Sequence, residues 1–324
     1  MCRDGPSLFV VALIIIVCVG PLSASGPNPG SEKVFRSSVE LVALNVVVTD
    51  ARQQYVRDLR EHDFVILEDG VRQPISFFAA GQVPLDLVLL IDTSSSMGPL
   101  RPTVQRAASG FLGVLKAEDR CAVVGFNQTV TVLQDLTGDR QALADAIRRA
   151  GASGDTSLYT AIYVALRQFG QPARQAGDVR RQAIVVLTDG EENASGLGFD
   201  ALQEEALSRG VAIYAIMLQT ASLLQHERVA GRLTPTRAAV KQLALESGAA
   251  AYFPRLASEL GDTYARIAAE LTNQYSIAYL PTTAGVDRTP HRIAIRIAAQ
   301  PGLRARTRTH YLPSGATLKM AAAR

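Results

Sequence analysis

Residues 85–97 read LDLVLLIDTSSSM, a short apolar run that ends in one carboxylate and a cluster of hydroxyls. Pro84 precedes the run and the polar cluster closes it, which is the pattern of a buried central strand in a parallel sheet. In open α/β sheets, ligands bind beyond the carboxyl ends of such strands. We therefore expect Asp92, Ser94 and Ser96 to emerge where a binding site would lie.

These three side chains offer only oxygen atoms, which suits a hard cation such as Mg²⁺. Alternate residues of an extended loop can point the same way, so the pattern D-x-S-x-S would present one carboxylate and two hydroxyls to a single ion. The pattern resembles the metal-ion-dependent adhesion site (MIDAS) of von Willebrand factor type A (vWA) domains. Five residues alone are a weak signal, because serine-rich loops are common. A metal site of this kind also needs ligands from other loops.

Two further stretches match the loops of that family's site. Residues 154–162 read GDTSLYTAI and resemble its threonine loop, while residues 185–190 read VVLTDG and resemble its third loop. The resemblance implies that three hydroxyls and two carboxylates bind the metal, the carboxylates directly or through water: Ser94, Ser96, Thr156, Asp92 and Asp189. The alternative is that these are turn residues that only cap helices.

The fold class is predicted from the alternation of strand-like and helix-like segments between residue 85 and about 272. That alternation is typical of an α/β protein with a doubly wound, mostly parallel sheet of the vWA or Rossmann-like type. The flanks are rich in β-branched residues and turn signals, which favours β-rich, sandwich-like segments. Whether the two flanks pack into one module is left open by the sequence.

We divide the chain of 324 residues into six segments. They are a signal peptide (1–24), a linker (25–33), a β-rich amino-terminal module (34–83), a vWA domain (84–272), a carboxyl-terminal β segment (273–313) and a tail (314–324). The signal peptide is inferred from a positive residue, an apolar run and a small-residue cleavage site; an uncleaved anchor is the alternative. In the last strand Arg304, Arg306 and Arg308 share one face, which we expect to be solvated; a basic docking patch is the alternative.

Composition narrows the function classes. A formal net charge of +3 is too small to indicate nucleic-acid binding, and the absence of Trp argues against a stacking platform for bases or sugars. Two of the three cysteines fall in the predicted signal, which leaves Cys121 without an internal disulfide partner. We expect an exported protein, in the periplasm, on the cell surface or outside the cell, with no membrane span after signal removal.

The function implied by the resemblance is adhesion-like binding rather than catalysis. A site completed by Mg²⁺, or by Mn²⁺ or Ca²⁺, would capture an Asp or Glu carboxylate of a protein partner. One alternative is a metal-dependent hydrolase similar to haloacid-dehalogenase-like phosphatases, with Asp92 as nucleophile. Those enzymes need D-x-D, and Ser94 stands where the second Asp should be. A structural scaffold with a stabilising ion is the other alternative.

Overall fold

The computed structural model describes residues 41–81, 83–169, 180–219, 229–282, 289–298 and 302–313. The predicted signal peptide (1–24), linker (25–33) and tail (314–324) lie outside these ranges. Within the described ranges, no helix combines the length and the apolar character that a bilayer crossing would need.

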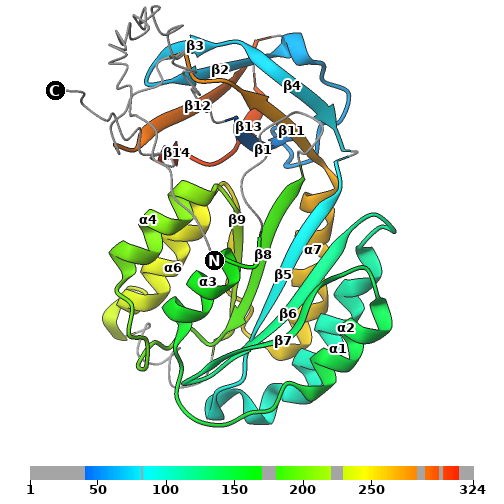
Figure 1. Ribbon diagram of the computed structural model, residues 1–324, viewed down its shortest axis with the longest axis vertical. Helices are drawn as coiled ribbons and strands as arrows, with labels where there is room; N and C mark the ends of the chain where they lie inside the picture. The colour runs from blue at the N-terminus through cyan, green and yellow to red at the C-terminus, as the bar shows by residue number, and fades with distance from the viewer. Residues whose placement is uncertain are drawn as a thin grey trace, which may run out of the picture. The chain divides into compact units, whose positions relative to one another are not determined.

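A six-stranded sheet lies between helices, with strand order β10-β9-β8-β5-β6-β7 (Figure 1). Its strands are β5 (Leu85–Asp92), β6 (Arg120–Phe126), β7 (Val130–Thr137), β8 (Arg181–Thr188), β9 (Ala212–Met217) and β10 (Ala251–Tyr252). All neighbours are parallel except β7, which runs antiparallel to β6. Every residue of β5 is buried, because helices cover both faces of the sheet. The predicted α/β class and mostly parallel sheet are confirmed.

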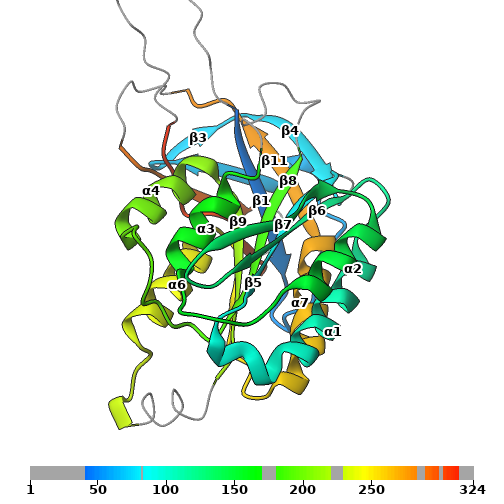
Figure 2. The same cartoon turned by 60° about the horizontal axis from the view of Figure 1, so that its bottom comes forward.

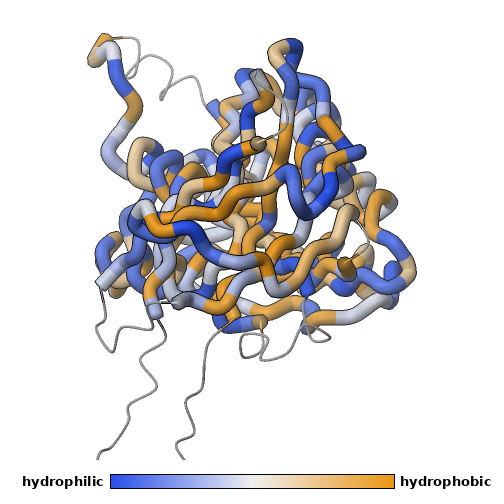
Figure 3. The backbone as a smooth tube through the Cα atoms, turned by 90° about the horizontal axis from the view of Figure 1, so that it is seen from above, coloured by the Kyte–Doolittle hydropathy of each residue, from blue (hydrophilic) through white to orange (hydrophobic). Residues whose placement is uncertain are grey.

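Six described helices pack in two layers on this sheet, as Figure 2 shows. They are α1 (Arg101–Phe111), α2 (Arg140–Arg149), α3 (Leu158–Leu166), α4 (Phe199–Arg209), α6 (Pro235–Glu246) and α7 (Leu260–Thr272). The odd positions of β5 share a core with α1, α2 and α7, while Val88 and Leu90 share another with α3, α4 and α6. Short 3₁₀ turns complete this part: η2 (Ser95–Leu100), η3 (Leu112–Val114) and η5 (Ala257–Glu259). The hydrophobic and hydrophilic stretches that build these layers can be followed along the chain in Figure 3.

Local sequence sets several helix ends. Asp139 caps α2 by accepting the N–H groups of Gln141 and Ala142, and Thr234 caps α6 by accepting the N–H of Arg237. Helix α4 ends at Gly210, whose φ of 64° is the left-handed conformation that glycine adopts at low cost. Such caps place the loops that precede and follow each helix.

The flanking segments form two four-stranded antiparallel sheets, with orders β13-β1-β11-β4 and β14-β12-β2-β3. The amino-terminal strands are β1 (Val42–Thr49), β2 (Phe64–Glu68), β3 (Val71–Gln73) and β4 (Ile75–Ala80), with the 3₁₀ turn η1 (Glu61–Asp63) before β2. The carboxyl-terminal strands are β11 (Gln274–Tyr279), β12 (His291–Ile297), β13 (Arg304–Arg306) and β14 (His310–Tyr311). Each sheet mixes strands from both flanks, and one apolar core joins Leu44 and Ile66 to Ile277 and Ile293. The two flanks therefore build a common module.

The expected solvated face is confirmed for Arg304, which is exposed, but it is wrong for Arg306, which is half-buried, and for Arg308, which is buried. Arg306 Nη2 lies 2.5 Å from a carboxylate oxygen of the buried Glu270 in α7, and Arg308 is only 8% exposed. The guanidinium carbon of Arg308 lies 5.9 Å from the centre of the Tyr311 ring. Strand alternation predicts which side chains share a face, but it does not reveal that another part of the chain covers that face.

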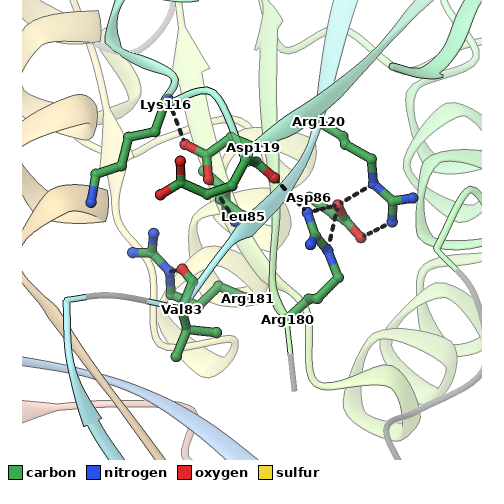
Figure 4. A network of polar contacts seen from close by, with 9 residues as sticks. Val83, Leu85, Asp86, Lys116, Asp119, Arg120, Arg180 and Arg181 are labelled. Carbon is green, nitrogen blue, oxygen red and sulfur yellow. Dashed lines mark hydrogen bonds and ion pairs between the residues drawn. The ribbon is translucent and has the colours of Figure 1, made fainter. Parts of the chain in front are cut away.

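A polar network fixes the amino-terminal ends of the central strands (Figure 4). Asp86 of β5 is buried and forms ion pairs with Arg120 at 2.7 Å and with Arg180 at 2.9 Å. Burial raises the pKa of Asp86, but the hydrogen bonds and charges of the two arginines outweigh it, so the pKa lies below its usual value. This anchored edge of the sheet lies opposite the carboxyl ends of the strands.

Candidate metal site

The two candidate carboxylates lie at the carboxyl ends of neighbouring parallel strands. Asp92 is the last residue of β5 and Asp189 directly follows β8; the strands pair in register from Leu85 opposite Arg181 to Ile91 opposite Leu187. Because parallel strands of matched register end at the same edge, the two acids emerge together. Both are buried, at 3% and 1% exposure.

The first loop holds the Asp92 carboxylate in a fixed direction. One oxygen, Oδ1, accepts the N–H of Ser94 at 2.8 Å, and the other, Oδ2, accepts the hydroxyl of Thr188 at 2.7 Å. Ser94 Oγ lies 3.0 Å from Ser96 Oγ, so the two candidate serines are in direct contact. Ser94 is buried and Ser96 is exposed. The set therefore reaches solvent at Ser96.

The second loop is hydrogen-bonded to both of the others. Ser95 in the first loop donates its N–H to the carbonyl of Gly154 at 3.0 Å. Thr156 is buried; its N–H donates to Asn193 Oδ1 at 2.8 Å, and the N–H of Asn193 donates back to the Thr156 carbonyl at 3.1 Å. These bonds bring the candidate threonine into the same loop cluster as the two carboxylates.

The third loop leaves one carboxylate oxygen of Asp189 without a partner. Oδ1 accepts the N–H of Glu191 at 3.2 Å, whereas Oδ2 is buried and has no hydrogen-bond partner in the described part of the chain. A buried polar atom left unpaired costs free energy, about 1 to 3 kcal/mol and more when it is charged. A divalent cation bound at Oδ2 would remove that cost, so the residues fit a metal.

Two residues make contacts that the sequence reasoning did not predict, and these contacts hold the loops together. Thr188 Oγ1 donates to Asp92 and accepts the N–H of Gly190 at 2.9 Å, which links the first and third loops. Glu192 accepts the N–H of Tyr159 at 2.8 Å at the start of α3. Their signals in the sequence are slight: a hydroxyl at the end of an apolar strand and an acid in a polar loop.

The electrostatics of the site also favour a cation. Burial raises the pKa of Asp92 to about 6; hydrogen bonds from Ser94 and Thr188 lower it, and the charge of Asp189 raises it further. No trio of His, Cys, Asp and Glu side chains in the described ranges gathers as a metal cluster. Two carboxylates with hydroxyls are instead an all-oxygen donor set, suited to Mg²⁺.

With metal removed by a chelator, the variant Asp92→Asn is expected to become more stable than the wild type as the pH rises through 6. The carboxyl of Asp92 has a pKa of about 6 in the folded chain and about 3.9 when unfolded. Its proton therefore stabilises the metal-free fold fully below about pH 4, and this contribution is lost as the pH rises through about 6.

The loss corresponds to about 2 to 3 kcal/mol between pH 4 and pH 7. Urea unfolding of both proteins from pH 4 to pH 8, with the difference between them plotted against pH, measures it. A difference that does not change with pH would contradict the expectation.

Comparison with known proteins finds curated relatives of part of the chain. The uncharacterised protein sll0103 of Synechocystis sp. is 33% identical over 113 residues, which are 34% of this chain and 26% of that protein. A UPF0353 protein of Mycolicibacterium paratuberculosis is 34% identical over 114 residues, 33% of this chain and 34% of that protein. The alignments thus span about a quarter to a third of the length of these relatives.

A solved structure and a family model extend the comparison. The von Willebrand factor type A structure from Catenulispora acidiphila aligns with 86% of this chain and 75% of that chain, at 11% identity and a TM-score of 0.48. The family model of the von Willebrand factor type A domain matches residues 86–253, just over half of the chain. The chain therefore belongs to the von Willebrand factor type A family.

Proposed function

We propose that this chain is a binding protein that holds Mg²⁺ in a MIDAS and uses it to capture a carboxylate of a protein partner. The metal ligands are Asp92, Ser94, Ser96, Thr156 and Asp189. The observation that carries the proposal is Asp189 Oδ2, a buried carboxylate oxygen without a hydrogen-bond partner among the described residues, at the same sheet edge as a second buried carboxylate.

The charge balance of the set supports capture of an acidic group. Two carboxylates neutralise a divalent cation without exceeding its charge. Mg²⁺ prefers octahedral coordination by oxygen and commonly keeps several waters, so a partner's Asp or Glu can replace one of them. Ser96 is the exposed member of the set, and we place the partner on that side. Mn²⁺ and Ca²⁺ are the other oxygen-preferring cations to test.

The proposed setting is outside the cytoplasm: periplasmic, at the cell surface or extracellular. It rests on the amino-terminal sequence, where a charged start, an apolar run and small residues at 22–24 have the pattern of an export signal. The partner is then another exported or surface protein.

We do not assign catalysis. In the alternative of a metal-dependent hydrolase, Ser94 would have to replace a catalytic Asp, and its hydroxyl lies against Ser96. A phosphatase assay with Mg²⁺ separates that alternative from binding. The scaffold alternative predicts metal binding with no partner that depends on the metal.

Calorimetric titration of Mg²⁺ into the chain from residue 25 onward tests the proposal. We expect saturable binding at one site, and then binding of a short peptide with one Asp only when Mg²⁺ is present. The same peptide with Asn in place of Asp is the matched control. Peptide binding that survives a chelator, or that the Asn peptide reproduces, would refute carboxylate capture. If Mg²⁺ failed to bind both with and without the Asp peptide, the metal site itself would be refuted.

A further inference from the structure

We infer that Arg237 is a positioning residue for the metal site: from inside the protein it holds the main chain of Asp189 so that the carboxylate faces the ion. The inference rests on the proposed metal site. Arg237 lies in the first turn of α6 and is wholly buried, at 0% exposure. It is the largest wholly buried side chain in the described part of the chain.

The guanidinium of Arg237 joins the third loop to the neighbouring strand. Nη1 donates to the carbonyl of Asp189 at 2.8 Å and to the carbonyl of Leu218 at 3.0 Å, just beyond the end of β9. The guanidinium carbon lies 5.2 Å from the centre of the Phe253 ring, close enough for a cation–π contact. One side chain thus fixes the position of the Asp189 carbonyl relative to two other elements.

The fit between Arg237 and the loop is tight. Gly190 has a φ of +86°, and a Cβ built on it would lie 2.6 Å from Arg237 Cγ. The N–H of Gly190 donates to Thr188 Oγ1, which in turn donates to Asp92. The main chain around Asp189 is therefore held by Arg237 on one side and, through Thr188, by the other carboxylate. The position from which the Asp189 side chain leaves the main chain is therefore set by these contacts.

The same contacts explain why a charged side chain occupies this buried position. A buried guanidinium is costly unless carbonyls or acids compensate it, and an apolar residue would fill the volume without that cost. Here the cation donates to the main-chain carbonyl of the buried Asp189, at the same sheet edge as a second buried acid, Asp92. The buried charge is thus compensated by the carbonyls of the loop and strand that it joins.

Arg181 provides a matched control at the other end of the same strand. It is the first residue of β8, whereas Asp189 follows the last. Arg181 is also buried, at 5% exposure, and its guanidinium also donates to main-chain carbonyls. One is that of Val83, at 2.8 Å (Figure 4), and the other is that of Leu271. Loss of either arginine should weaken the fold, but only Arg237 contacts the metal loop.

The experiment is Mg²⁺ calorimetry on the wild type, Arg237→Met, Arg237→Lys and Arg181→Met, with urea unfolding to measure the stability of each. We expect Arg237→Met to raise the Mg²⁺ dissociation constant about 10- to 100-fold, the loss of affinity typical of residues that support a metal ligand. Arg237→Lys keeps the charge and should lose less. Arg181→Met should lose stability and keep the wild-type dissociation constant.

Three outcomes would count against the inference, and they differ. If Arg237→Met binds Mg²⁺ with the wild-type dissociation constant, the inference is overturned while the metal site stands. If Arg237→Met does not fold, a wild-type dissociation constant in both Arg237→Lys and Arg181→Met has the same meaning. Equal weakening in Arg181→Met would show a general effect of destabilisation and overturn it too. A wild-type chain that binds no Mg²⁺ would overturn the metal site and this inference together.

Discussion

Asp189→Ala is expected to lower the affinity for Mg²⁺ at least about 100-fold, beyond the roughly 10- to 100-fold loss for residues that only support a ligand. It removes one of two carboxylates, so half of the negative charge that balances the ion is lost. The metal-free fold should become more stable, because the change removes a buried, unpaired oxygen that costs about 1 to 3 kcal/mol. Oδ2 of Asp189 has no hydrogen-bond partner among the described residues, and Oδ1 accepts one long bond, at 3.2 Å from the Glu191 N–H.

The same change should lower the pKa of Asp92, because the charge of Asp189 is one of the causes that raise it. Calorimetry measures the affinity for Mg²⁺, and urea unfolding in the presence of a chelator measures the stability of the metal-free fold. Glu191→Ala is the matched control, since it removes an exposed acid two residues away. Undiminished Mg²⁺ binding in Asp189→Ala, or an equal loss in Glu191→Ala, would show that Asp189 is not a ligand.

Gly248→Ala is expected to destabilise the protein by about 2 to 5 kcal/mol. Gly248 follows α6 with a φ of +81°, a conformation that costs an L-residue roughly 1 to 2 kcal/mol. A Cβ there would lie 2.4 Å from the main-chain nitrogen of Arg308 and 2.5 Å from the carbonyl carbon of Thr307. Main-chain atoms cannot rotate away, so overpacking adds about 1 to 3 kcal/mol.

Gly70→Ala separates the two causes. Gly70 has a φ of +86°, and nothing lies within 4 Å of a Cβ built on it, so only the conformational cost of roughly 1 to 2 kcal/mol should appear. Urea unfolding of both variants gives the comparison. Equal losses in the two would mean that the segment at Thr307 moves aside, and that the close packing of the carboxyl-terminal segment on the end of α6 has no rigid role.

The sequence was most informative where structure depends on neighbouring residues. The apolar run of β5 is a local pattern, and the strand lies where that pattern predicts it. Strand β3 has three residues, too few to show an alternation, and sequence reasoning missed it. The half-buried Arg306 forms an ion pair with Glu270, which is distant in the chain, so no local pattern could reveal it.

The same division holds at the site. The five candidate ligands follow from three short motifs, and the structure brings the loops that carry them together. That they bind metal stays a prediction. Arg237 lies 48 residues after Asp189, and the residues around it indicate only the start of a helix. Its contact with the loop that carries Asp189 is therefore visible only in the folded chain. Thr188 belongs to the third motif, but its hydrogen bond to Asp92 joins two separate loops, so the motif alone does not reveal that bond.

The strand order of the flanking module has a consequence for how the chain folds. Strand β1 lies between β11 and β13, and Ala80 at the end of β4 pairs with Tyr275 in β11, so the whole vWA domain is enclosed between two paired residues. Closing such a long loop costs chain entropy. A vWA domain that folds first brings its own two ends together and so meets that cost in advance.

Nascent β1 and β4 therefore have to wait for strands that are synthesised about two hundred residues later. We expect pulsed hydrogen exchange during refolding to protect the amides of β5 and β8 before those of β1 and β11. Simultaneous protection of all four strands would contradict this order. In the expected order, the module built from the two flanks is the last part to form. Its formation then indicates that the vWA domain enclosed by it has already folded.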